Sequence, residues 1–207
     1  MKKSTFEKNL KELQSEQTKQ LIIEVSTKLF ARKGFYGTSI ADLAQAAGLT
    51  KGALYHHFKD KDDIFFAVIN SVRSIWQEKV AREVICGRNS LDKISILFEK
   101  HADLLSQNDF MCLVMSNLMN EMGDDDPKYS SVLNDTYQEF VLFVEEIIYS
   151  GQSKGEIRTD LDPRLLSLNI VGILKGIGCY PQLNFVKIDR KAMANSLKII
   201  LLDGLES

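Results

Sequence analysis

Residues 38–61, TSIADLAQAAGLTKGALYHHFKDK, predict a helix that ends in a tight turn and is followed by a second, shorter helix. Ser39 can cap the first helix, because its hydroxyl can accept a hydrogen bond from an amide in the first turn. Apolar side chains recur along that helix at helical spacing, at Ile40, Leu43, Ala44 and Ala47. Gly48 then stands where a helix ending in the left-handed region favours a residue without a β-carbon. These residues predict the corner between two packed helices.

The second helix begins at Thr50, whose side chain can cap it, and it directs Leu54 and Phe58 inward. Ala44 precedes Gly48 by four positions, and Leu54 follows that glycine by six. The small side chain allows the helices to approach, the glycine forms the corner and the leucine closes the core between them. This spacing is typical of a DNA-binding helix-turn-helix, although a plain helical hairpin also uses alanine, glycine and leucine.

The outward side chains of the second helix favour the DNA-binding interpretation. They are small, basic or hydrogen-bonding, at Thr50, Lys51, Gly52, Ala53, Tyr55, His56 and His57. No acidic residue occurs between Asp42 and Asp60, whereas a solvated helix face usually carries both signs of charge. Residues 1–65 also carry 11 Lys and Arg against 8 Asp and Glu, although the whole chain has a net charge of −2. A basic N-terminal part suits binding to phosphates.

Several motifs in and around this segment occur together in one known family. They are Gly34-Phe35, Thr38-Ser39, Thr-Lys-Gly at 50–52, Leu54-Tyr55-His56-His57-Phe58, and Lys61. With these motifs the run from Gly34 to Ile69 resembles the N-terminal domain of the tetracycline-repressor (TetR-like) family of bacterial transcription regulators, and the resemblance extends without a gap from about Thr18. GEIRTDLDP, residues 155–163, is similar to the linker before the last two helices in many members.

The resemblance implies an all-α protein with a three-helix helix-turn-helix domain at 17–64 and a helical ligand-binding and dimerisation domain at 65–207. Residues 1–16 form an N-terminal extension, expected as a short amphipathic helix or a lysine-bearing tail. A long helix at 60–82 is expected to link the two domains. Further helices are expected at 17–33, 91–106, 109–122, 129–152, 163–180 and 189–205. The 3 Pro and 12 Gly, with little strict alternation of apolar residues, agree with a helical protein.

Carried over residue by residue, the resemblance assigns two kinds of DNA contact. Contacts to the phosphate backbone are implied for Thr38, Ser39, Tyr55, His57 and Lys61. Contacts to base edges are implied for Thr50, Lys51, Gly52, Ala53 and His56. The lysine suits the acceptors of guanine, the alanine can touch a thymine methyl, and the glycine lets the start of the helix approach the groove floor. For the tyrosine and the histidines, packing against neighbouring helices is the alternative.

One such helix per chain is too little for a specific site, so we expect a homodimer on a palindromic double-stranded DNA operator. The helix at 163–180 is apolar over more than half of its circumference, as expected of a helix buried on two sides. The expected dimer interface comprises Leu166, Ile170, Ile173, Leu174, Ile177, Leu197, Ile200 and Leu201. An intramolecular core alone is the alternative.

The middle helices are rich in methionine and aromatic residues, which fill irregular spaces and tolerate repacking. Such residues at helical spacing also form ordinary core. The resemblance implies that a small hydrophobic effector binds here, shifts the long linking helix and releases DNA. The expected lining residues are Trp76, Phe98, Phe110, Met115, Met119, Tyr137, Phe140 and Val144. The protein is therefore expected to be a repressor that an apolar or amphipathic ligand releases from its operator.

Composition and motifs exclude several other classes. No apolar run reaches the ~20 residues of a membrane helix, and no secretory signal follows the N-terminal lysines. Cys86, Cys112 and Cys179 form no Cys-x-x-Cys pair and are interpreted as reduced, mostly buried thiols of a cytoplasmic protein. No nucleophile elbow, phosphate-binding glycine loop or paired His/Cys ligand set occurs. We therefore expect no enzyme activity, metal or cofactor.

Two groups of residues could suggest a metal or catalytic site. His101 with Asp103 could form a metal site or an acid–base pair, and the aspartates at 124–126 could bind calcium, but neither has suitable ligand spacing. Two other functions stay open. The chain could be a helix-turn-helix regulator controlled by a protein partner or by cysteine oxidation, or an enzyme with an all-helical body.

Overall fold

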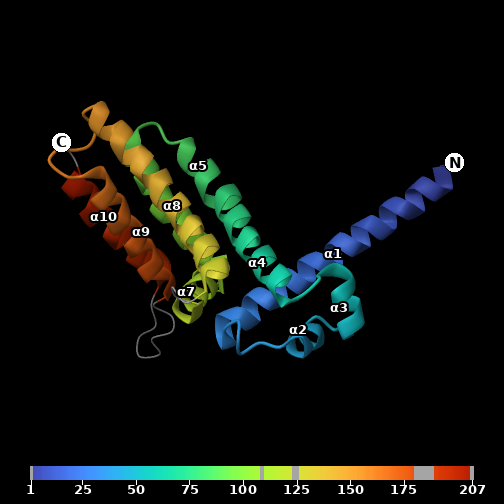
Figure 1. Ribbon diagram of the computed structural model, residues 1–207. Helices are drawn as coiled ribbons and strands as arrows, with labels where there is room; N and C mark the ends of the chain where they lie inside the picture. The colour runs from blue at the N-terminus through green and yellow to red at the C-terminus, as the bar shows by residue number, and fades with distance from the viewer. Residues whose placement is uncertain (1, 108–109, 123–125, 180–188, 206–207) are drawn as a thin grey trace. The chain divides into compact units, whose positions relative to one another are not determined.

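The computed structural model describes residues 2–107, 110–122, 126–179 and 189–205. All regular structure within these ranges is helical, which confirms the all-α prediction (Figure 1). The elements are α1 (Lys2–Lys33), α2 (Ile40–Ala46), α3 (Lys51–His57), α4 (Lys61–Trp76), the π-helix η1 (Gln77–Ala81), α5 (Arg82–Ile85), α6 (Ser90–Gln107), α7 (Phe110–Met122), α8 (Pro127–Ser153), α9 (Pro163–Cys179) and α10 (Arg190–Leu205). No helix in these ranges joins enough length with enough apolar character to traverse a lipid bilayer.

The first helix differs most from the sequence prediction. α1 begins at Lys2, so residues 2–16 extend the predicted helix at 17–33 and do not form a separate element. The 32 residues of α1 contain neither glycine nor proline and are rich in Lys, Glu, Gln and Leu, which favour helix. Leu10 and Leu13 on this extension are exposed. Three of the segments between the predicted helices, at 107–108, 123–128 and 181–188, lie wholly or partly outside the described residues.

The chain divides into two compact units, Met1–Ser71 and Val72–Ser207. The division falls inside α4, beyond the domain boundary expected after residue 64. In the first unit, α1 packs against α2 and α3. Phe35 is at the centre of the aromatic core of this unit, with its ring centroid 5.5 Å from that of Phe30 and 5.6 Å from that of Phe65.

The corner between α2 and α3 is formed by local hydrogen bonds. The Ser39 hydroxyl accepts from the Asp42 amide at 3.1 Å, and the Asp42 carboxylate accepts from the Ser39 amide at 2.9 Å. At the other end of α2, Gly48 has a φ of 67°, and the amide of Leu49 donates to the Ala44 carbonyl at 2.8 Å. This is the capping geometry that a left-handed glycine permits. Thr50 then caps α3 by accepting from the Ala53 amide at 3.1 Å.

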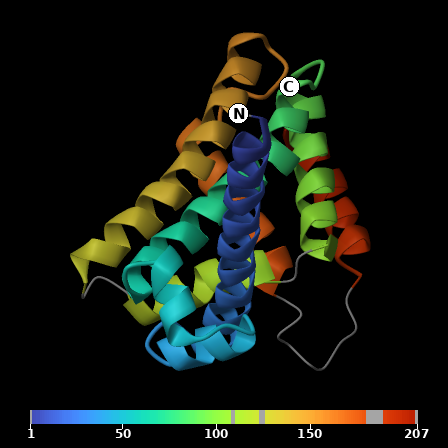
Figure 2. The same ribbon diagram turned by 90° about the vertical axis from the view of Figure 1, so that its right-hand side faces the viewer.

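The second unit is a set of packed helices. α8, α9 and α10 lie side by side in Figure 1, and Figure 2 shows α6 beside α10. α7 packs against α8 and α9. Of the cysteines, Cys112 is half-buried, but Cys86 is exposed, contrary to the expectation of mostly buried thiols, because it lies at the C-terminal end of α5. The side chain of Cys179 lies outside the described residues.

The chain from Lys61 to Ile85 is helical without interruption, as predicted for the long linking helix. Its middle part, Gln77–Ala81, is a π-helix that begins directly after Trp76. Single π segments inside α-helices occur frequently at functional sites. The position of the π-helix therefore indicates Trp76 and the residues around it as a candidate functional site.

Candidate functional site

The outer face of α3 is available to bind another molecule. Lys51, Gly52 and His56 are exposed, and Tyr55 is 50% exposed. Ala53 and His57 are half-buried, and the rings of His56 and His57 meet edge to face with centroids 5.3 Å apart. The Tyr55 side chain is therefore partly packed within the unit and partly open to solvent. The first unit thus brings together the residues predicted for base contacts.

Two of the predicted backbone contacts already have a part in the fold. Thr38 is 1% exposed, and its hydroxyl donates to the Gly34 carbonyl at 2.6 Å. Ser39 is exposed but belongs to the capping box of α2. The hydrogen bonds that Ser39 gives to the Asp42 carboxylate lower the pKa of Asp42 to about 2. This cap therefore stays intact at any physiological pH.

Lys61 is also engaged inside the first unit. Its ammonium donates to the Phe35 carbonyl at 2.9 Å and to the Thr38 carbonyl at 3.0 Å, and it lies 4.2 Å from the Phe35 ring centroid. It thereby ties the start of α4 to the turn before α2. A phosphate would have to share this ammonium with two carbonyls, so we infer a structural role for Lys61 in addition to any DNA contact.

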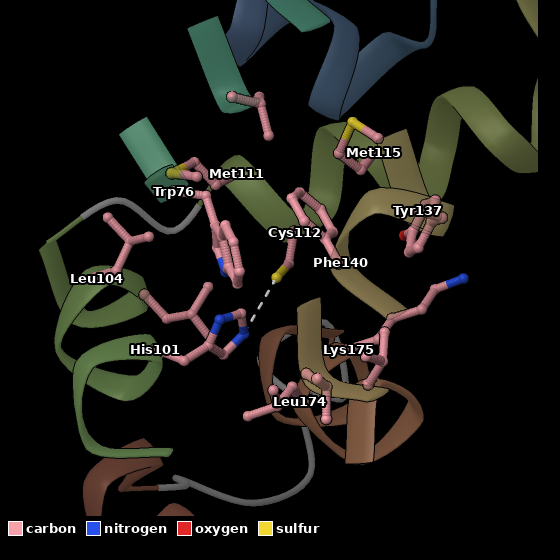
Figure 3. Close-up of a pocket in the computed structure, with 14 residues that line it drawn as sticks. Trp76, His101, Leu104, Met111, Cys112, Met115, Tyr137, Phe140, Leu174 and Lys175 are labelled. Carbon is pink, nitrogen blue, oxygen red and sulfur yellow. Dashed lines mark hydrogen bonds between the residues drawn. The ribbon is translucent and has the colours of Figure 1, made fainter. Parts of the chain in front are cut away.

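The second unit contains a small, partly open apolar cavity of about 60 Å³ (Figure 3). It is lined by Val72, Trp76, His101, Leu104, Leu105, Met111, Cys112, Met115, Tyr137, Phe140, Val144, Val171, Leu174 and Lys175. The indole of Trp76 packs on Phe140 with ring centroids 4.6 Å apart. Arg73, next to this cluster on α4, forms a two-pronged ion pair with Glu139 on α8.

The residues that the sequence analysis proposed for the ligand site lie in different places. Trp76, Met115, Tyr137, Phe140 and Val144 line the cavity, whereas Phe98, Phe110 and Met119 do not. Phe98 is buried but borders a surface hollow between α6 and α10. Phe110 is the first residue of α7, and Met119 is half-buried further along that helix. These side chains are of the types that line apolar cavities, but their positions on the helices place them outside this one.

His101 is the lining residue that sequence reasoning set aside. It is 8% exposed, and burial lowers its pKa to about 4, with the nearby Leu174 carbonyl opposing part of that effect. Its Nε2 lies 3.9 Å from the Cys112 Sγ, and its Nδ1 has no hydrogen-bond partner in the described part of the chain. The apolar neighbours at Leu97, Leu104 and Leu105 were the signal, since they share a helix face with position 101.

The predicted dimer residues lie in different environments. Leu166, Ile170, Leu174 and Ile177 are buried within the single chain, and Leu174 lines the cavity. Ile173, Leu197 and Leu201 are half-buried, and Ile200 is 68% exposed. The exposed apolar residues of α9 and α10 are Leu165, Leu168, Ile199 and Ile200. Only the last of these belonged to the predicted interface.

Two family models match the chain. The model of "Bacterial regulatory proteins, tetR family" matches residues 22–68, and that of "YsiA-like protein, C-terminal region" matches residues 71–204. The fatty acid metabolism regulator protein of Bacillus subtilis (strain 168) is 23% identical over 186 residues, which are 90% of this chain and 94% of that protein.

Solved structures share the fold. The transcriptional regulator FadR from Bacillus subtilis, in complex with stearoyl-CoA, has a TM-score of 0.76 and 23% identity, covering 89% of this chain and 98% of its own. AibR, in complex with isovaleryl coenzyme A and operator DNA, has a TM-score of 0.75 and 20% identity, covering 88% and 97%.

Substitution of Gly52 by alanine is expected to stabilise the fold and to weaken DNA binding. A β-carbon at Gly52 would meet only the Thr50 hydroxyl, at 3.9 Å, so G52A should stabilise α3 by up to about 1 kcal/mol. If the backbone here approaches the groove floor, the same methyl should weaken DNA binding at least about tenfold. Gly204→Ala, in open space on α10, is the control for thermal unfolding and DNA titration. Unchanged DNA affinity of G52A would remove Gly52 from the interface.

Lys61→Ala is expected to destabilise the protein by about 1–3 kcal/mol, because it removes a charged donor from two backbone carbonyls. Lys59→Ala, at an exposed position two residues away, should change stability by less than about 0.5 kcal/mol. Urea unfolding of both variants measures the difference. Equal stability of the two variants would contradict the structural role of Lys61 and leave only the expected phosphate contact.

The buried His101 is expected to make stability fall in mild acid. In the unfolded chain the imidazole titrates near 6.5 and in the folded chain near 4, so the unfolded state binds more protons between these values. Stability should be constant above about pH 7 and should decrease by about 2 kcal/mol on going to pH 5. His101→Gln should lose this part of the pH dependence in urea unfolding. The same slope in both proteins would contradict the burial of a neutral imidazole.

Proposed function

The chain belongs to the tetR family of bacterial regulatory proteins, and we propose that it is a homodimeric repressor which a coenzyme A thioester releases from a near-palindromic operator. The observation that carries this proposal is that α4 contributes residues both to the core behind the DNA-binding helices and to the cavity. Phe65 on this helix packs in the core behind the DNA-binding helices, and Trp76 on the same helix lines the cavity. A ligand that moves Trp76 therefore acts on a helix that also belongs to the DNA-binding unit.

The DNA-binding role of α3 rests on its shape and its chemistry. Its exposed face offers an ammonium, a phenol and an imidazole, at Lys51, Tyr55 and His56, with a glycine at its start. These groups suit the acceptors of guanine and the phosphate oxygens. A dimer would present two such helices to half-sites about 34–36 Å apart or a multiple of that distance. A regulator of this kind works in the cytoplasm, where the operator is.

The class of effector follows from the cavity together with the relatives. Apart from Trp76, His101, Cys112, Tyr137 and Lys175, the lining side chains are hydrocarbon or thioether. An acyl group suits such a lining, and two structures with the same fold hold acyl-coenzyme A molecules of very different length. Lys175, whose ammonium lies 5.1 Å from the Tyr137 ring centroid, is a cation suited to the anionic part of a thioester.

Because the cavity is small, binding of an acyl group would have to move the side chains that line it. A space of about 60 Å³ is well below the ~300–1,000 Å³ of pockets that hold drug-sized ligands. An acyl group must therefore displace lining side chains, of which the unbranched Met111 and Met115 move most readily. Displacement of Trp76 would also disturb its packing on Phe140 and the neighbouring Arg73–Glu139 pair. The ligand would thus favour a different arrangement of α4.

The dimer surface is proposed on the exposed apolar residues of α9 and α10. Leu165, Leu168 and Ile200 are 62%, 47% and 68% exposed in the single chain, and burying such side chains is worth about 1.5–3 kcal/mol each. The neighbouring Gly172 leaves open space at its α-carbon, which lets another backbone approach. Of the residues named for this surface, only Ile200 also belongs to the interface expected from the sequence.

The proposed function is tested by gel shift of the full-length protein on the DNA upstream of its own gene. Isovaleryl-, octanoyl- and stearoyl-CoA are added to the complex, with free coenzyme A as the control. At least one thioester should release the DNA at micromolar concentration, and free coenzyme A should not. Saturable DNA binding that no thioester alters would contradict the effector class. Absence of a saturable complex at low salt would contradict the DNA-binding role.

A cavity-filling variant is expected to bind DNA normally but not to be released by the thioester. Val171→Phe places a larger side chain in the cavity, so the protein should keep its DNA affinity and lose the response to the active thioester. Val132→Phe is the matched control, since Val132 is half-buried on α8 outside the lining, and it should keep both properties. Undiminished release of the V171F complex would place the effector elsewhere.

A further inference from the structure

The spacing of the buried residues explains why the linking helix contains a π-helix. Four buried side chains follow one another at intervals of four positions, at Val72, Trp76, Val80 and Val84. An α-helix completes a turn every about 3.6 residues, so intervals of four would move these side chains progressively round the helix. In η1 the Arg82 amide donates to the Gln77 carbonyl, five positions earlier, so this turn takes in an additional residue. The wider turn lets all four side chains remain buried.

Before η1, the linking helix reaches α8 through long side chains. The Trp76 indole packs on Phe140 with ring centroids 4.6 Å apart, and the Arg73 guanidinium pairs with the Glu139 carboxylate. Val72 and Trp76 are the residues of α4 that line the cavity, and none of the described lining residues belongs to η1 or α5. A ligand in the cavity therefore acts on the helix up to Trp76, directly before the π-helix.

From η1 onward the helix is fixed to α6 instead. Both η1 and α5 pack on α6, and Val80 and Val84 are fully buried. The turn after α5 is also close to α6, because a β-carbon added to Gly87 would lie 2.9 Å from the backbone nitrogen of Lys93. This part of the helix can move only if its contacts with α6 are broken. The linking helix therefore changes its packing partner from α8 to α6 at the π-helix.

The outer side of η1 faces solvent. The side chains of Gln77, Glu78 and Lys79 are exposed, so bending at this place breaks few contacts of these residues. π-Bulges are among the few places at which helices bend sharply. The π-helix thus combines a backbone suited to bending with two ends that are anchored on different helices. These are the properties of a hinge.

Building on the function proposed above, we propose that η1 is the hinge on which the linking helix turns when the ligand enters the cavity. The ligand displaces Trp76, the wide turn at Gln77–Ala81 takes up the bend, and α5 stays on α6. A regular α-helix in place of η1 would transmit the displacement of Trp76 to Val84 and its contacts with α6, so the same movement would cost more free energy. The hinge therefore sets how strongly ligand binding favours the new arrangement of α4.

Deletion of Glu78 tests the hinge, because it removes the additional residue of the wide turn. The buried residues would then follow one another at intervals of four, three and four, which suit a regular α-helix. The full-length deletion variant should bind the operator within about twofold of the wild-type affinity, but release by the active one of isovaleryl-, octanoyl- and stearoyl-CoA should need at least about tenfold more ligand. Glu78→Ala, which keeps the length of the turn, is the control and should behave as the wild type.

Two outcomes of this comparison would overturn the hinge. One is a deletion variant that binds the operator and releases it at the wild-type concentration of thioester. The other is a folded deletion variant that no longer binds the operator, because the π-helix would then be needed for the DNA-bound arrangement itself.

The fluorescence of Trp76 tests the hinge without any ligand, since Trp76 is the single tryptophan of the chain. Bending at η1 moves the buried indole and exposes it to acrylamide. Quenching in the free protein should therefore be at least about twofold weaker in the deletion variant than in Glu78→Ala. Equal quenching in the two variants would contradict bending at this place.

Hydrogen exchange of the full-length wild-type protein decides the question if the deletion variant does not fold. The amides of residues 78–82 should exchange at least about tenfold faster than those of residues 68–76, because a hinge opens more readily than the α-helix before it. Exchange as slow as in the preceding turns would overturn the hinge.

These measurements separate the hinge from the proposed effector class. If no thioester releases the DNA, the effector class is wrong, and the quenching and exchange measurements still decide the hinge. If a thioester releases the wild type and the deletion variant alike, the hinge alone is wrong.

Discussion

The uninterrupted helix from Lys61 to Ile85 is the constraint on which this protein depends. At its start, Lys61 holds two backbone carbonyls of the turn before α2, and Phe65 packs on Phe35. Further along, Trp76 packs on Phe140 at the wall of a cavity. A helix transmits displacement because its backbone hydrogen bonds resist local bending. The π-helix begins only after Trp76, so it does not interrupt the stretch that joins these contacts.

The cavity is lined mainly by side chains that can rearrange around a ligand. Its methionine and leucine side chains can move aside for a ligand, and they set only a loose limit on shape. His101, buried among these side chains, is kept neutral because burial disfavours its charged form.

The sequence predicted the DNA-binding unit better than the cavity, and the reason is the range of the interactions. The caps at Ser39 and Thr50 and the left-handed Gly48 are local, so spacing alone indicates them. Lys61, by contrast, reaches carbonyls more than twenty positions earlier, which no local pattern reveals. In the body, composition indicated a pocket, but the face on which Phe98 or Leu174 lies depends on how distant helices pack. His101 was set aside because a single histidine has no motif.

If the cavity and α3 communicate through α4, the operator and the effector must oppose each other to the same extent, since coupling between two binding sites is reciprocal. The direct measurement is the affinity of the full-length protein for its active thioester, free and saturated with operator DNA. The account predicts that DNA weakens thioester binding by the same factor by which the thioester weakens DNA binding. Equal thioester affinity in the presence and absence of DNA would contradict it.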